Sequence, residues 1–105
     1  MDIQIIETLN SHNKLLIDCM NHWGKDMQLT IVIEEMAELT KEICKHKRGS
    51  KNYCAIMEET VDVLIMINQL YIIVNFSGSE FNRILESKLR RINNRLLSEK
   101  ESDEL

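Results

Sequence analysis

Two pairs of acidic residues lie inside strongly apolar sequence, and they restrict how this chain can fold more than any other feature. Glu35 and Glu38 form the first pair, and Glu59 and Asp62 form the second. Each pair is spaced three apart, which on a helix places both carboxylates on one face, one turn from each other. Carboxylates in apolar surroundings are costly unless positive charge compensates them. The pattern therefore favours two helices that direct four carboxylates at a divalent cation, most commonly Mg²⁺.

Other interpretations of these acids remain open from the residues alone. The plainest is that both helices carry ordinary solvated acidic faces. A di-iron bundle normally supplies Glu-x-x-His motifs, and neither Glu35 nor Glu59 has a histidine at that offset. Ligation by carboxylates alone instead indicates Mg²⁺, with Mn²⁺ as a substitute. Glu34 and Glu58 fit equally well as groups that support the ligands or bridge a second ion and as acids in solvent.

The composition favours long helices in one small domain. The chain has 105 residues, of which 44% are hydrophobic, three are glycine and none is proline. The spacing of apolar residues predicts four helices, over about residues 3–21, 26–48, 52–75 and 79–97. No segment has a strand pattern. We therefore predict an all-α fold, with one domain over residues 1–97 and a charged, fraying tail over residues 98–105.

Candidate capping residues mark the ends of these helices. Gly24 suits a left-handed cap after the first helix, where Trp23-Gly24 ends the apolar pattern. Asp26 is a candidate N-cap for the second helix and Ser79 for the last. The basic residues 45–48, followed by glycine, are typical of a helix C-terminus.

Charge and cysteine content narrow the class of protein. The formal net charge of −4 argues against nucleic-acid binding through a basic surface. Cys19, Cys44 and Cys54 have neither CxxC nor zinc-finger spacing, so we expect reduced core residues in a cytoplasmic protein. No secretory signal opens the chain. The most apolar run, 61–76, is interrupted by polar residues and is shorter than the roughly 20 residues of a spanning helix, so no membrane partner is expected.

The helix predicted over residues 52–75 is apolar on almost every face beyond Asp62. Three companion helices from one chain hardly cover it, and an exposed apolar surface of that size usually marks an interface. We therefore expect a homo-oligomer.

Polar residues outside the acid pairs are candidates for substrate binding. Lys88, Arg91 and Arg95 form one row on the last predicted helix and suit phosphate oxygens, although a solvated face is equally compatible. Trp23 and Gln28 suit stacking on a base and hydrogen bonding to it. A core or interface role for Trp23 is at least as compatible with its position.

The acid motifs resemble the MazG-like superfamily of all-α nucleoside triphosphate pyrophosphohydrolases. The match is close in the segments Ile33–Leu39 and Glu58–Leu64, and looser around Trp23-Gly24, Gln28 and Lys88–Arg91. The resemblance covers roughly residues 20–96. Within the superfamily, the chain looks like a short, single-domain member of the phage or Firmicute type. The resemblance implies a four-helix-bundle-type fold that is completed by homo-oligomerisation, as a dimer or a tetramer.

The same resemblance implies an activity. A Mg²⁺ ion held by Glu35, Glu38, Glu59 and Asp62 would support hydrolysis of a nucleoside triphosphate to a monophosphate and pyrophosphate, for house-cleaning or control of a nucleotide pool. One carboxylate, Glu38 or Glu35, would accept the proton of the attacking water, and Lys88 with Arg91 would stabilise developing charge. The aromatic-rich insertion of dCTP-specific members is not seen, so base preference stays open. The alternatives are a regulatory helical protein that binds nucleotide or metal without hydrolysis and a purely structural helical dimer.

Overall fold

The computed structural model describes residues 1–104, which form five α-helices and no strand. In chain order these are α1 (Ile3–Ser11), α2 (Asn13–Trp23), α3 (Lys25–Lys47), α4 (Tyr53–Val74) and α5 (Gly78–Glu104). The predicted all-α class is confirmed. The chain divides into two compact units, residues 1–75 and the segment from Phe76 onward.

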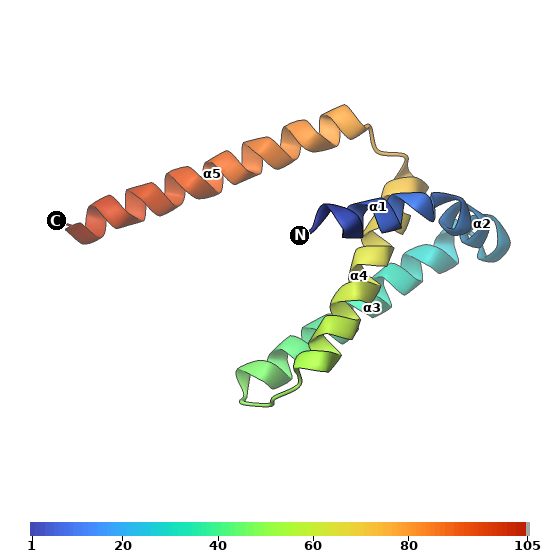
Figure 1. Ribbon diagram of the computed structural model, residues 1–105, viewed down its shortest axis with the longest axis horizontal. Helices are drawn as coiled ribbons and strands as arrows, with labels where there is room; N and C mark the ends of the chain where they lie inside the picture. The colour runs from blue at the N-terminus through green and yellow to red at the C-terminus, as the bar shows by residue number, and fades with distance from the viewer. Residues whose placement is uncertain (105) are drawn as a thin grey trace. The chain divides into compact units, whose positions relative to one another are not determined.

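Helices α3 and α4 form the hairpin at the centre of the first unit (Figure 1), and α2 packs against both. Gly49 turns the chain between them with a φ of 99°. Asn52, the N-cap of α4, donates from its amide to the backbone oxygen of Glu42 at 3.0 Å and to its carboxylate at 2.6 Å. These bonds tie the end of α3 to the start of α4.

The first predicted helix is divided in two, because the helical pattern breaks at His12. The Ser11 hydroxyl donates to the Thr8 backbone oxygen at 2.8 Å, and His12 Nδ1 lies 2.8 Å from the same oxygen. Side chains that bond to nearby backbone groups compete with the helical ladder. The prediction of one helix over residues 3–21 was therefore wrong at this point.

Two predicted caps were misplaced by two residues each. Gly24, with a φ of 91°, directly precedes α3, so Asp26 lies in the first turn of that helix and is not its N-cap. Its charge there favours the positive end of the helix dipole. At α5, Ser77 and not Ser79 accepts from a backbone N–H of the first turn, at 3.4 Å from the Glu80 nitrogen.

The charged segment predicted as a tail is helical in the part that the structure describes. Helix α5 continues from residue 98 to Glu104, and residue 105 lies outside the described residues. An ion pair between residues four apart supports this end of the helix, since Arg95 Nε donates to a Glu99 carboxylate oxygen at 3.0 Å.

Two glutamines occupy the most buried part of the first unit. Gln69 is fully buried, and its Nε2 donates to the Leu16 backbone oxygen and to Gln28 Oε1, both at 3.0 Å. One side chain on α4 therefore holds α2 and α3 together. Leu16 and Val32 are the buried apolar residues among those described.

Replacing Gln69 with leucine should destabilise the fold. The side-chain volume is nearly kept, but the buried Gln28 amide loses its partner, which typically costs about 1–3 kcal/mol. Urea unfolding should show a lower midpoint with an unchanged slope. Gln4→Leu, on the exposed face of α1, is the control and should change stability by less than about 0.5 kcal/mol. Equal stability of the two variants would contradict a structural role for the glutamine pair.

Much apolar surface remains uncovered on the hairpin. Met36 and Ile43, which lie about two turns apart on one face of α3, are exposed. Cys44 and Cys54 are exposed and Cys19 is half-buried, so the prediction of three core cysteines was wrong for two of them. Among the described residues, no helix is both long enough and apolar enough to cross a membrane.

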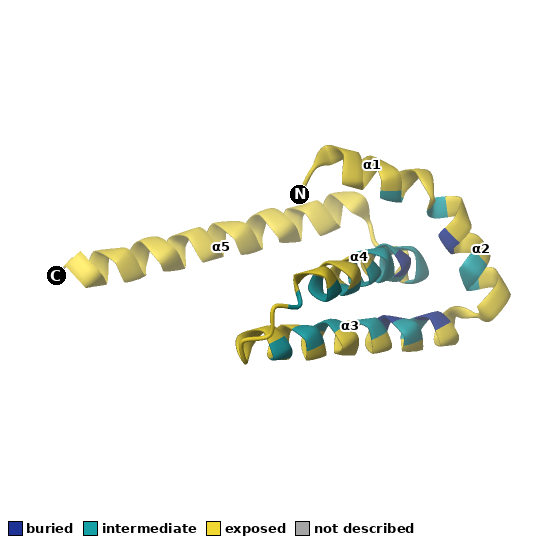
Figure 2. Ribbon diagram, turned by 60° about the horizontal axis from the view of Figure 1, so that its bottom comes forward, coloured by how far each residue is buried: buried dark blue, intermediate teal, exposed yellow. Residues whose placement is uncertain are grey.

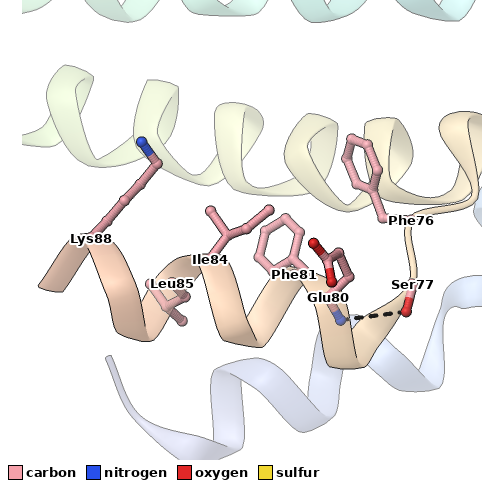
Figure 3. A pocket seen from close by; sticks show the side chains of 7 residues that line it. All are labelled: Phe76, Ser77, Glu80, Phe81, Ile84, Leu85 and Lys88. Atoms are coloured by element: carbon pink, nitrogen blue, oxygen red, sulfur yellow. Dashed lines mark hydrogen bonds between the residues drawn. The ribbon is translucent and has the colours of Figure 1, made fainter. Parts of the chain in front are cut away.

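Helix α5 has no buried residue (Figure 2), although it carries an apolar row. Members of this row that are exposed include Phe81, Leu85, Leu89, Ile92 and Leu96. At its N-terminal end, Phe76, Phe81, Ile84 and Leu85 surround an apolar hollow of about 420 Å³ (Figure 3). The ring centroids of the two phenylalanines are 5.9 Å apart.

Candidate metal centre

Three of the four predicted carboxylates converge between α3 and α4. Glu35 lies on α3, and Glu59 and Asp62 lie on α4. One oxygen from each lies within 4.8 Å of the other two. We call these three residues the carboxylate triad.

The buried glutamine pair sets the register of this triad. Gln28 precedes Glu35 by seven residues on α3, and Asp62 precedes Gln69 by seven on α4. Seven residues are about two helical turns, so they return to the same face. Because the two helices run in opposite directions, pairing Gln28 with Gln69 places Glu35 opposite Asp62.

Glu38 lies outside the triad. It is exposed, and its Oε2 is 3.8 Å from Lys41 Nζ on the same helix. Its negative charge nevertheless acts on the site, since it contributes to raising the pKa of both Glu35 and Glu59.

Crowding of negative charge perturbs the triad. Partial burial, followed by the charge of Asp62, raises the pKa of Glu35, and a side-chain hydrogen bond to Asp62 adds to this shift. Burial and the Asp62 charge likewise raise the pKa of Glu59. Glu42 behaves oppositely, because hydrogen bonds from Asn52 and Lys45 lower its pKa. The triad, unlike Glu42, therefore holds negative charge that the protein does not compensate.

This contrast predicts the pH dependence of the metal-free protein. A raised pKa means that the folded state binds the proton more tightly than the unfolded state. The resulting stability is fully present below the ordinary value of 4.5 and is lost as the pH rises through the raised pKa values. The melting temperature in EDTA should therefore fall as the pH rises above 4.5.

Replacing Glu59 with glutamine should flatten this trend in melting temperature. Saturating Mg²⁺ should also counter it, because a ligand that binds only the folded state raises the melting temperature. Contributions from Glu42 and Glu80, whose pKa values are lowered by hydrogen bonds, are lost only as the pH falls below 4.5, so they do not interfere. An identical fall in melting temperature with rising pH in wild type and Glu59→Gln would argue against coupling within the triad.

The triad has the chemistry of a site for a hard divalent cation. Its donors are all carboxylate oxygens, which Mg²⁺ and Mn²⁺ prefer, and two elements supply them from opposite sides. A bound cation would offset both causes of the two raised pKa values, the burial of the carboxylates and the repulsion between them. Of the four carboxylates predicted as ligands, Glu35, Glu59 and Asp62 converge in the triad, and Glu38 does not.

The predicted substrate-binding residues of the first unit have different surroundings. Trp23, at the end of α2, is 58% exposed and meets His22 edge to face, with ring centroids 5.2 Å apart. Gln28 is buried and bonded to Gln69, and its Nε2 has no hydrogen-bond partner among the described residues. An exposed indole is available to a ligand, whereas Gln28 is held inside the hairpin.

The basic row lies in the second unit. Lys88, Arg91 and Arg95 are exposed on α5, and Arg95 is engaged with Glu99 on its own helix. Lys88 borders the apolar hollow at the start of that helix (Figure 3).

Sequence reasoning missed Gln69 and Asn52, which organise the hairpin without belonging to the triad. The available signal was a lone glutamine inside an apolar helix, a residue type that is seldom buried without a partner. No family model, curated protein or solved structure matches this chain.

Proposed function

We propose that this protein is a Mg²⁺-dependent nucleoside triphosphate pyrophosphohydrolase of the MazG-like type, cleaving between the α- and β-phosphates. The observation that carries this proposal is the carboxylate triad, in which Glu35, Glu59 and Asp62 bring oxygens within 4.8 Å of one another from two helices. The motif resemblance around these residues supplies the reaction. The triad supplies a physical reason for the cation.

In the proposed reaction, some of these residues would hold the metal ion and others would accept a proton or contact the substrate. Mg²⁺, when bound, would neutralise the triphosphate and make the attacking water more acidic. Glu59 and Asp62 would hold the ion together with Glu35. Glu38 or Glu35 would accept the water proton, while the bond to the departing pyrophosphate breaks and its electrons pass to pyrophosphate oxygen. Trp23 would contact the base, and the resemblance implies that Lys88 and Arg91 bind phosphate oxygens.

The proposed active form is a homo-oligomer, dimer or tetramer, in which copies complete the helical bundle. Exposed apolar residues on α3, such as Met36 and Ile43, support this, as does the apolar row of α5. An isolated helix gains little stability from intrinsic propensity alone. The 27 residues of α5, none of them buried, therefore need another surface.

The test is pyrophosphate release from a panel of ribo- and deoxynucleoside triphosphates with Mg²⁺. Equal amounts of pyrophosphate and monophosphate, lost in EDTA, are expected, and the ranking of substrates identifies the base. Release of orthophosphate instead would overturn the assigned bond. Tight Mg²⁺-dependent nucleotide binding without any product would favour the regulatory alternative.

A further inference from the structure

A second polar site lies on α4, away from the carboxylate triad. Asn68 follows Glu59 by nine residues, which is about two and a half helical turns, so it lies on the opposite side of the helix. There Asn68 and Asn75 meet Asn10 and Asn13 around a hollow of about 400 Å³. We call this the asparagine pocket.

The pocket forms where two helices end. Asn10 and Asn13 flank the break at His12 that separates α1 from α2. Asn75 caps α4 in the left-handed conformation, with a φ of 58°. Amide side chains from these helix ends therefore line one space.

The amide pair at its centre leaves complementary atoms available. Asn68 Nδ2 donates to Asn13 Oδ1 at 2.9 Å. This bond leaves the Asn68 oxygen as an acceptor and the Asn13 nitrogen as a donor, on two neighbouring half-buried side chains. The remaining walls, Ile17, Tyr71 and Ile72, are apolar or aromatic. None of the residues that line the pocket carries a charge.

We infer that the asparagine pocket binds the base of a nucleoside, separately from the carboxylate triad. Asparagine side chains read base edges through paired donor and acceptor bonds, and the apolar side chains of Ile17 and Ile72 offer contact to the flat faces of a base. Since the lining contains no lysine or arginine, phosphates add nothing to binding there. The pocket is thus a metal-independent nucleoside site, and this inference does not rest on the proposed hydrolase activity.

The experiment is a titration of the full-length, ¹⁵N-labelled protein with adenosine and, separately, uridine in EDTA, followed by NMR. Side-chain amide signals of Asn13 and Asn68 should shift, while those of buried Gln28 should not. Asn68→Leu should weaken binding at least about tenfold, as expected for loss of a paired amide contact. Asn94→Leu on α5 is the matched control and should bind as wild type does.

Further variants keep the inference falsifiable. If Asn68→Leu folds poorly, Asn10→Ala, at an exposed position, should still weaken binding. Asp62→Asn should leave nucleoside affinity unchanged, and adenosine triphosphate in EDTA should bind no more tightly than adenosine. No shift with either nucleoside would overturn the inference. Loss of binding in Asp62→Asn would do so as well, because it would assign the nucleoside to the triad.

Discussion

Asp62→Asn should abolish Mg²⁺-dependent pyrophosphate release while making the metal-free protein more stable. The change keeps the size of the side chain but removes one of three converging charges, and that charge is a leading cause of the raised pKa of both Glu35 and Glu59. Changing a residue that only supports a metal ligand typically costs 10–100-fold. Losing a ligand should therefore lower the rate by more than about 100-fold.

The predicted loss of activity and gain in stability have opposite signs, so general misfolding cannot explain both. Thermal unfolding in EDTA should give a higher melting temperature for Asp62→Asn than for wild type, and Mg²⁺ should no longer raise it. Glu7→Gln, on exposed α1, removes a charge far from the triad in sequence and is the control for both readouts. A folded Asp62→Asn protein with full activity would eliminate the triad as the catalytic centre. Loss of activity accompanied by loss of helical signal would be uninformative about catalysis, so Glu59→Gln is tested in parallel.

Leu89→Glu should break the association between copies of the chain. Leu89 is central in the apolar row of α5 and is 56% exposed in the single chain. A few residues near the centre of an interface cost about 2 kcal/mol or more when they are replaced, which corresponds to about thirtyfold in the association constant. Sedimentation equilibrium at micromolar concentration should give wild type at a multiple of 12.3 kDa and shift the variant toward that mass.

A control variant with the same charge elsewhere on α5 distinguishes a loss of association from a general effect of the added charge. Asn94→Glu adds the same charge five residues further on, which is about 140° around the helix from Leu89. It should sediment as wild type does. A wild-type protein that is strictly monomeric would contradict the proposed oligomer, and equal association of Leu89→Glu and wild type would remove α5 from the interface.

Helix formation was predictable because it depends on neighbours in sequence. The predicted helix over residues 52–75 agrees with α4 to within one residue at each end, since Asn52 and Asn75 both cap it. The break at His12 was not predictable from apolar spacing. At the break, the Ser11 hydroxyl and His12 Nδ1 both lie within hydrogen-bond distance of the Thr8 backbone oxygen. Hydrophobic periodicity carries no information about such side-chain bonds to the backbone.

The candidate site was likewise predictable in part. Spacing alone placed Glu59 and Asp62 on one face of a helix, because three residues make about one turn. The same spacing placed Glu35 and Glu38 on one face of a helix. Among the described residues, however, only Glu35 joins the triad, and Glu38 is exposed beside Lys41. Spacing along one helix cannot distinguish the two, since both satisfy it.

By itself, the sequence determined that this chain is helical and that the two acids of each pair lie one helical turn apart. Both properties depend on residues within about four positions of each other. The tertiary structure decided which carboxylates converge, through the pairing of Gln28 with Gln69 across the hairpin. It also decided that four asparagines share one pocket. Both outcomes depend on the register between segments that are distant in sequence, and that register is set by a few buried contacts and not by any local pattern.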